Sequence, residues 1–244
     1  MIENPPALVL WDIDRTLLYV GNVDRQVYRE AFFEVVGRPA ERLPARGTGV
    51  TMPLAIGSLL RENGVAASEV PKLLPRIAEL LPKRLADHMA DLRSEGALMP
   101  GAVAALRAVH AHPGLASTVV TGNLKPNAIL KLEAFELDQF VDVEIGGYAS
   151  DDDNRPALVA IAQKRAQAKH GSTFGPSKTV IIGDSLEDVR TGLEGGAAVI
   201  AVASGTTPAT ALQQAGADVV LDGLTDIQQL MGALSEALSP SERL

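Results

Sequence analysis

The sequence of 244 residues contains no cysteine, which excludes disulfide bonds, cysteine nucleophiles and cysteine-ligated zinc sites. Aromatic residues make up only 4% of the chain, so aliphatic side chains must fill the interior. The net charge is -8, and no run rich in lysine or arginine offsets it. We therefore expect no nucleic-acid partner, because such partners attract clustered positive charge.

Long apolar runs are missing as well. No stretch approaches the roughly 20 apolar residues that a helix needs to span a bilayer, so we expect no membrane partner. The first residues, MIENPPALVLWD, have neither the basic stretch nor the long apolar region of a signal peptide. From these features we expect a cytoplasmic protein that is a monomer or a homodimer.

The order of apolar segments predicts an α/β fold. Residues 7–11 (ALVLW) form a continuous apolar run that is typical of a buried parallel strand. From Met99 onward, strand-like runs alternate with helical segments. The expected strands are residues 115–120, 141–145, 179–182, 198–202 and 218–221. Repeated strand–helix units predict a doubly wound, mainly parallel sheet with helices on both faces.

Residues 21–96 have a different character. Apolar residues recur every four positions from Val23 to Val35, which indicates one face of a helix, and no convincing strand pattern follows. Pro75 and Pro82 are expected to kink or divide a later helix. The predicted domains are an α/β core (residues 1–20 and 97–244) and an inserted all-helical cap (residues 21–96).

Polar side chains follow the predicted strands. Ligands of open parallel sheets bind beyond the carboxyl ends of the strands. The residues at these positions are Asp12, Asp14, Thr121, Asn123, the polar run 150–155, Asp184 and Asp188. Four carboxylates at one edge repel each other unless a cation lies among them, and oxygen ligands favour Mg²⁺ where phosphate is present. Nearby hydroxyl, amide and basic groups are the donors that a phosphate needs.

Three of these segments resemble signatures of the haloacid dehalogenase superfamily. LVLWDIDRTLL is similar to the first signature, VVTGN to the second and IIGDSLEDV to the fourth. The insert resembles the helical cap of phosphoglycolate phosphatases and β-phosphoglucomutases, and the overall pattern is nearest to the phosphoglycolate phosphatase-like group. This resemblance spans nearly the whole chain. It implies a Mg²⁺-dependent phosphatase whose partner is a small phosphorylated metabolite.

The resemblance also implies roles for individual residues. Asp12 would attack phosphorus and form an aspartyl-phosphate, and Asp14 would protonate the leaving oxygen and then activate water. Dehalogenases of the superfamily lack this second carboxylate, so its presence favours a phosphatase. Asp12, the main-chain carbonyl of Asp14 and Asp184 would bind Mg²⁺, with support from Asp188. Thr121 would hydrogen-bond the phosphoryl group.

Two basic residues compete for the third signature, which is usually a lysine. Arg155 occupies the expected place; an arginine can hold two phosphate oxygens but is no neutral replacement for lysine. Lys125, four residues after Thr121, is the alternative and a candidate substrate-binding residue. The first signature departs from the family as well, because Arg15 stands where glycine is common and the turn there must tolerate a side chain.

Three points stay open in the sequence. Asn123 binds substrate or only forms a turn. The glycine-rich loop at residues 45–51, with Arg46 as a possible ligand for a phosphate or carboxylate, faces the site or merely joins two helices. A phosphosugar mutase and a non-catalytic phosphate-binding regulator are alternatives to the phosphatase. The complete carboxylate set argues against the regulator, and the lack of another basic cluster in the cap loops argues against the mutase.

Overall fold

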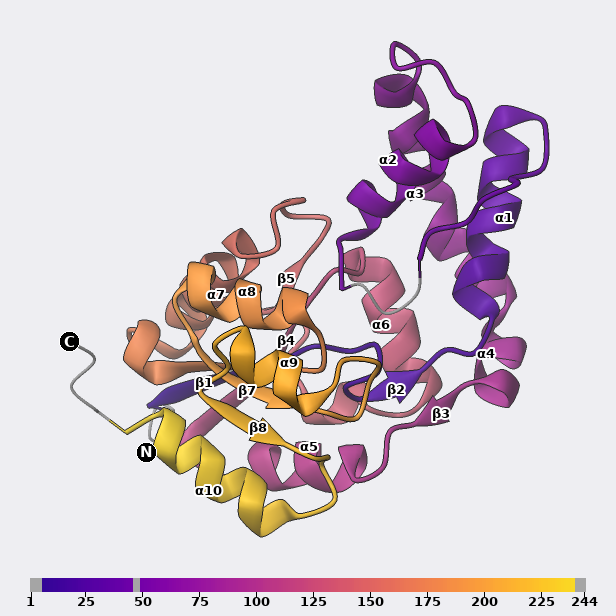
Figure 1. The fold of residues 1–244 in the computed structure, drawn as a ribbon. Helices are drawn as coiled ribbons and strands as arrows, with labels where there is room; N and C mark the ends of the chain where they lie inside the picture. The colour runs from indigo at the N-terminus through magenta and orange to yellow at the C-terminus, as the bar shows by residue number, and fades with distance from the viewer. Residues whose placement is uncertain (1–5, 46–48, 240–244) are drawn as a thin grey trace.

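The computed structural model describes residues 6–45 and 49–239 (Figure 1). It confirms the α/β fold: a six-stranded sheet has the order β5-β4-β1-β6-β7-β8, and its neighbouring strands pair in parallel. Its strands are β1 (Ala7–Trp11), β4 (Leu115–Thr121), β5 (Gly147–Tyr148), β6 (Thr179–Gly183), β7 (Ala198–Val202) and β8 (Val219–Leu221). The order runs outward from β1 in both directions, which is the doubly wound arrangement.

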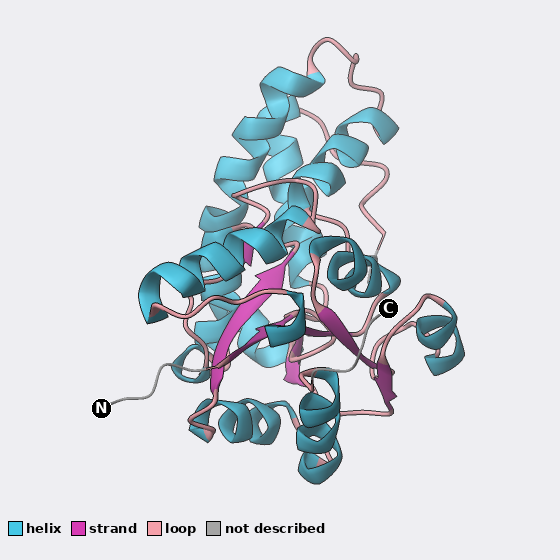
Figure 2. Cartoon of the chain, turned by 90° about the vertical axis from the view of Figure 1, so that its left-hand side faces the viewer, coloured by secondary structure: helices cyan, strands magenta, loops and turns pink. Residues whose placement is uncertain are grey.

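Helices cover both faces of this sheet (Figure 2). On one face lie α5 (Ala102–Ala111) and α10 (Ile227–Ala237), and on the other α7 (Ala157–His170) and α8 (Leu186–Gly195). Val9 and Trp11 of β1 belong to the first apolar cluster. Leu8 and Leu10 belong to the second. A strand buried on both sides has no polar face, which explains the continuous apolar run at residues 7–11.

The remaining helices of this part are shorter or lie at its margin. They are α6 (Lys125–Ala134), α9 (Ala209–Gln214) and the 3-10 turns η1 (Asp138–Phe140) and η2 (Pro176–Lys178). Among the described residues, no helix is both long and apolar enough to cross a membrane.

The segment between β1 and β4 forms a separate helical group to one side of the sheet (Figure 1). The helical group consists of α1 (Val23–Val36), α2 (Met52–Glu62), α3 (Val70–Asp87) and α4 (Met89–Glu95). The chain enters and leaves it through an antiparallel ribbon of β2 (Leu18–Tyr19) and β3 (Ala97–Leu98). This ribbon lies near the predicted domain boundaries, and the division into two domains stays a prediction.

One local expectation is wrong, and a second is wrong in part. Residues 141–145 form no strand; the Asp142 carboxylate accepts a hydrogen bond from the Glu144 amide, which turns the chain, and the strand comes later as β5. Of the two effects expected of Pro75 and Pro82, the division of the helix is wrong, because α3 runs unbroken over both, and the kink stays a prediction. Its apolar side, with Ile77 and Leu81 fully buried, packs against α1 and holds the helix together.

The position of the candidate site follows from the strand order at the centre of the sheet. Strand β1 lies between β4 and β6, and the chain order reverses there. A crevice therefore opens beyond the carboxyl ends of these three strands. The helical group stands over the same end (Figure 1), so a ligand in the crevice is enclosed by both parts of the chain.

Candidate active site

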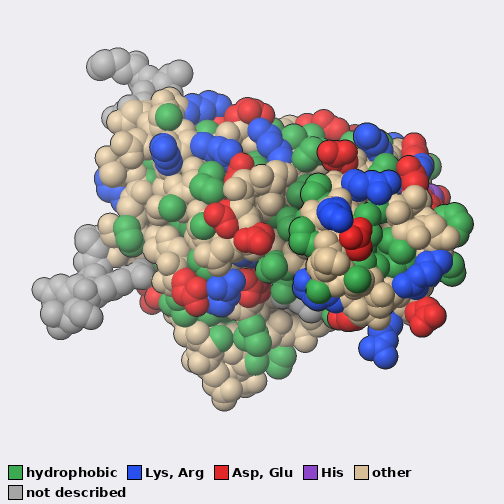
Figure 3. Space-filling view, turned by 90° about the horizontal axis from the view of Figure 1, so that it is seen from above, with side chains coloured by type: hydrophobic (Ala, Val, Ile, Leu, Met, Phe, Trp, Pro, Cys, Tyr) green, Lys and Arg blue, Asp and Glu red, His purple; other side chains and the backbone are tan. Residues whose placement is uncertain are grey.

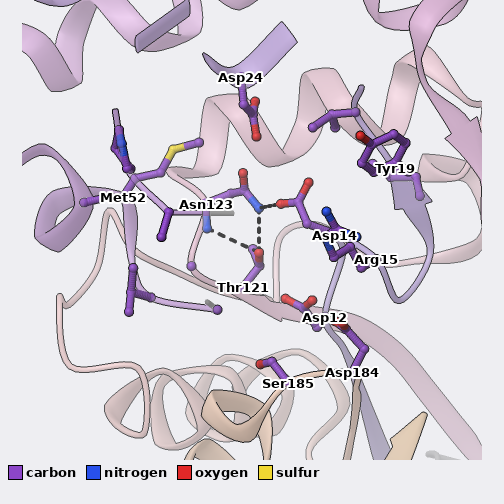
Figure 4. A pocket seen from close by; sticks show the side chains of 18 of the residues that line it. Asp12, Asp14, Arg15, Tyr19, Asp24, Met52, Thr121, Asn123, Asp184 and Ser185 are labelled. Carbon is purple, nitrogen blue, oxygen red and sulfur yellow. Dashed lines mark hydrogen bonds between the residues drawn. The ribbon is translucent and has the colours of Figure 1, made fainter. Parts of the chain in front are cut away.

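One cavity collects most of the polar residues that follow the strands, and Asp188 lies beside it rather than in its lining (Figure 4). Asp12 follows β1, Thr121 ends β4 and Asp184 follows β6. The predicted residues that line the cavity are Asp12, Asp14, Thr121, Asn123, Arg155 and Asp184. Arg46 lies outside the described residues. The parallel register of the three strands brings together groups that are more than 100 residues apart in the sequence.

An acidic cluster, defined as Asp12, Asp184 and Asp188, forms the floor of the site. Each carboxylate offers an oxygen, and these oxygens all lie within 4.8 Å of one another. All three side chains are buried. Asp188 is fixed by a capping box at the start of α8, in which its Oδ2 accepts hydrogen bonds from the amide and hydroxyl of Ser185. The Thr16 hydroxyl lies 3.3 Å from Asp184 Oδ1.

Arg155 supplies the positive charge of this cluster. Its Nη2 donates to Asp12 Oδ1 at 2.6 Å and also to Asp188 Oδ1, and its side chain is 1% exposed. Lys125 has other partners: its Nζ lies 3.1 Å from both carboxylate oxygens of Glu144, and it does not line the cavity. Of the two candidates for the third signature, the structure therefore brings Arg155 to the acidic cluster.

The charges of the cluster do not balance within the protein. Burial, and next the charge of Asp188, raise the pKa of Asp12 well above its ordinary range. The same two causes raise the pKa of Asp184 to about 7. With three carboxylates and one guanidinium, the ionised cluster carries a charge of −2, which one divalent cation neutralises. Asp184 Oδ2 is buried without a hydrogen-bond partner among the described residues, so an acceptor is free for such an ion.

Asp14 is built into a different set of contacts. Its carboxylate is 36% exposed and lines the cavity. Asn123 Nδ2 donates to its Oδ2 at 2.7 Å, as the dashed line in Figure 4 shows. Lys131 Nζ lies 2.9 Å from its Oδ1 and 3.0 Å from its Oδ2. The two aspartates of the first signature thus have separate cationic partners, Arg155 for Asp12 and Lys131 for Asp14.

Lys131 is the residue that sequence reasoning missed. It lies on the inner side of α6 beside the buried Ala128 and Leu132, and its own side chain is fully buried. A lysine at an apolar position of a helix was the available signal, because a buried lysine needs carboxylate partners. Its second carboxylate is Asp24 at the start of α1, 2.8 Å from Nζ.

Thr121 and Asn123 act as a pair. The Thr121 hydroxyl oxygen accepts hydrogen bonds from the Asn123 amide at 3.2 Å and from its Nδ2 at 2.8 Å. Both side chains are buried, so the turn after β4 is part of the cavity wall. Gly122 between them permits a close approach of the chain, since a Cβ there would lie 2.7 Å from the Val50 carbonyl oxygen.

The described end of the glycine-rich loop closes against the same wall. Gly49 and Val50 line the cavity, and the Gly49 carbonyl accepts a hydrogen bond from Arg155. Gly49 has a φ of +69°, and a Cβ there would meet the Ser185 hydroxyl at 2.6 Å. Arg15 also adopts a left-handed conformation, with a φ of 66°, and its guanidinium lies 5.2 Å from the centre of the Tyr19 ring. The turn after Asp14 therefore does tolerate a side chain.

Comparison with known proteins agrees with this arrangement. Residues 9–192 match the family described as haloacid dehalogenase-like hydrolase. No curated protein sequence matches the chain. The matched range includes Asp12, Asp14, Thr121, Arg155 and Asp184.

Several solved structures share the fold. A candidate β-phosphoglucomutase from Bacteroides vulgatus is 19% identical, with a TM-score of 0.66 over 97% of this chain and 92% of that one. A hydrolase from Pseudomonas syringae is 22% identical, with a TM-score of 0.65 over 96% and 100%. A candidate phosphoglycolate phosphatase from Lactobacillus plantarum is 20% identical, with a TM-score of 0.64 over 93% and 99%. At these identities the likeness concerns the fold alone.

Proposed function

Because the chain belongs to the haloacid dehalogenase-like hydrolase family, we propose that it is a phosphatase for small phosphate monoesters, with Asp12 as the nucleophile. The observation that carries this proposal is that Asp12 and Asp14 line one cavity and have different partners. Two carboxylates in different surroundings can take different parts in a reaction, one as nucleophile and one in proton transfer.

Asp12 is suited to attack a phosphoryl group. It is buried beside Arg155, whose charge offsets the repulsion between an anionic nucleophile and an anionic phosphate. Attack by a carboxylate oxygen on phosphorus breaks the bond to the leaving oxygen and gives an aspartyl-phosphate. The Thr121 oxygen already accepts two hydrogen bonds, so its hydroxyl hydrogen stays available for a phosphoryl oxygen.

Asp14 is the group placed for proton transfer. It is partly exposed at the cavity, whereas Asp12 is buried. In the first step it would give a proton to the leaving oxygen, and in the second it would take one from the water that attacks the aspartyl-phosphate. Phosphate binding alone does not require a second, partly exposed carboxylate at the cavity, so Asp14 supports a catalytic protein over one that only binds phosphate.

We further propose Mg²⁺ as the cofactor. Asp12, Asp184 and the main-chain carbonyl of Asp14 would hold it, with Asp188 in support. The uncompensated charge of the acidic cluster and the unpartnered Asp184 Oδ2 fit a hard divalent cation with oxygen ligands. When bound, the ion would neutralise negative charge on the nucleophile and the phosphoryl oxygens.

The cavity supports a small substrate, and its lining supports an acidic one. Its volume is about 160 Å³, comparable to the cavities of about 150 Å³ that hold a benzene-sized molecule. Arg25 of α1 lines it and donates to the Pro44 carbonyl at 3.3 Å, and within the described residues it forms no ion pair. A carboxylate on the leaving group would complement this charge, which favours a phosphoglycolate phosphatase-like activity. Arg25→Ala should then raise KM for a phosphorylated acid more than for a neutral aryl phosphate.

The surface is in keeping with a small-molecule partner. On the face seen in Figure 3, acidic and basic side chains are interspersed rather than gathered into one basic patch. Together with the net charge of -8, this supports our proposal that neither nucleic acid nor a membrane is a partner. We also propose that the protein works in the cytoplasm as a monomer or homodimer.

The test is release of inorganic phosphate from an aryl phosphate and from a panel of metabolite phosphates. Activity should require Mg²⁺ and stop with excess chelator. Asp12→Asn removes the nucleophile without a change in volume and should abolish turnover while the far-ultraviolet circular dichroism stays unchanged. Near-normal turnover by Asp12→Asn would refute the covalent mechanism, and no phosphate release from any substrate would favour a binding protein.

A phosphosugar mutase is the alternative that shares the nucleophile. A sugar 1-phosphate supplied with catalytic sugar bisphosphate distinguishes the two. Steady release of phosphate supports the hydrolase, whereas conversion to the 6-phosphate with little free phosphate would establish the mutase.

A further inference from the structure

Lys131 is held in a closed network with Asp14, Asp24 and Asn123. Besides its contacts with Asp14, its Nζ lies 2.8 Å from Asp24 Oδ2 and 2.9 Å from Asn123 Oδ1. A lysine ammonium has three hydrogens, and these three residues supply an acceptor for each of them. Since the side chain is also fully buried, Lys131 has no hydrogen left for a substrate. Any part that it plays in the reaction must pass through the residues it contacts.

The contacts of Lys131 and Asn123 fix the plane of the Asp14 carboxylate. Asp14 Oδ2 accepts a hydrogen bond from Asn123, and the one Lys131 hydrogen that faces Asp14 is shared between Oδ1 at 2.9 Å and Oδ2 at 3.0 Å. A carboxylate oxygen has two lone pairs, so Oδ1 keeps one free. Asp14 is therefore held in a single orientation without losing the capacity to carry a proton.

Asp24 explains how the lysine stays in place. Burial on its own would lower the pKa of Lys131, but the charges of Asp14 and Asp24 outweigh it and raise the pKa. The ammonium consequently stays charged. Asp24 belongs to α1 of the helical group, whereas Lys131 belongs to α6, so the ion pair also joins these two parts of the chain.

We propose that Lys131 is a positioning residue, which with Asn123 orients the Asp14 carboxylate toward the leaving oxygen of the substrate. This inference rests on the proposed phosphatase function. A group that must meet a departing oxygen within hydrogen-bond reach loses much of its effect when it is free to rotate. Without Lys131, the Asp14 carboxylate could still transfer a proton, but it would no longer be held in the orientation that faces the leaving oxygen.

The experiment measures kcat/KM for aryl and alkyl phosphates whose leaving groups span a wide range of pKa. This ratio reports the steps up to release of the leaving group, and poor leaving groups depend most on protonation. Lys131→Met should lower kcat/KM by about 100-fold for an alkyl phosphate and by less than about 10-fold for an activated aryl phosphate. The matched control is Lys164→Met, the same substitution at an exposed position of α7, which should leave the whole series unchanged.

A double variant separates positioning from a general loss of structure. If Lys131 acts through Asp14, then the double variant Asp14→Asn/Lys131→Met should differ in kcat/KM from Asp14→Asn alone by less than about 3-fold. The reason is that the effects of two substitutions in one functional unit do not add. Equal losses with and without Asp14, or an equal loss for every leaving group, would overturn the proposal. These outcomes leave the phosphatase function intact, since that fails only if the unaltered protein releases no phosphate.

Asn123→Ala provides the test if Lys131→Met does not give a folded protein. This variant removes the 2.7 Å donor to Asp14 and leaves the Lys131 ion pairs in place. It should lower kcat/KM more for alkyl than for activated aryl phosphates, and in the Asp14→Asn background that difference should vanish. A loss that is independent of the leaving group would contradict the proposal in this form as well.

Discussion

Acidification should weaken the binding of Mg²⁺ through Asp184. Burial, and next the charge of Asp188, raise the pKa of Asp184 to about 7 in the absence of metal, from an ordinary value of 3.8. A metal ion binds the ionised form, so below pH 7 it must displace a proton. From Asp184 alone the apparent affinity should fall about tenfold per pH unit between pH 7 and pH 4, which is ~4 kcal/mol at about 1.36 kcal/mol per unit, and protonation of Asp12 adds to this fall.

The same shift sets the stability of the metal-free protein. The folded state binds the Asp184 proton more tightly than the unfolded state does. The stabilisation from this proton is therefore complete below about pH 4 and is lost as the pH rises through 7. The stabilisation that added Mg²⁺ gives should instead increase with pH, because it grows with the affinity of the protein for the ion. The difference in melting temperature with and without Mg²⁺ should thus widen from pH 5 to pH 8.

Thermal melts at several Mg²⁺ concentrations across this pH range measure the effect directly. Asp184→Asn removes one of the two ligands with a raised pKa and should reduce the pH dependence along with most of the affinity, while Asp12 still titrates. Asp153→Asn, the same substitution at an exposed position, should leave both unchanged. A Mg²⁺-induced shift in melting temperature that is constant from pH 5 to pH 8 would refute the assignment of Asp184 as a metal ligand with a raised pKa.

Four substitutions test other parts of the site. Arg155→Ala should lower kcat by about 10²–10³-fold, because it removes the charge beside Asp12. Lys125→Ala, which removes only an exposed ion pair, should lower kcat by less than about 3-fold. If steady-state kinetics gave the reverse ranking, Arg155 would not be the basic residue that assists Asp12. Asp14→Asn should reduce kcat/KM far more for alkyl than for activated aryl phosphates, and an equal reduction would remove Asp14 from proton transfer. Gly183→Ala should displace the Asp188 carboxylate, since a Cβ there would lie 2.2 Å from Asp188 Cγ, and should weaken Mg²⁺ binding in calorimetric titrations. Unchanged affinity would mean that the position of Asp188 does not matter for Mg²⁺ binding.

Local patterns in the sequence were enough to predict the fold and the floor of the site. The run at residues 7–11 indicates a strand buried on both faces, and the positions after the strands lead to Asp12 and Asp184 because parallel strands end at one edge of the sheet. Both predictions depend on the period and order of residues that are close together along the chain. The strand predicted at residues 141–145 shows where this fails, since the segment VDVEI alternates like a strand but forms a bend in which the Asp142 carboxylate accepts a hydrogen bond from the Glu144 amide.

The partners of the reactive groups were decided only by the tertiary structure. The place of Arg155 in the sequence favours it over Lys125 for the third signature but does not decide between them. Packing of α7 against the sheet buries Arg155 beside Asp12, which is 143 residues away, and leaves Lys125 with Glu144. Lys131 lies at an apolar position of a helix, which indicates that it needs carboxylate partners, but nothing in the sequence identifies them as Asp14, 117 residues away, and Asp24. A buried charge is tolerated only where the fold surrounds it with opposite charges, and that condition depends on contacts between distant segments.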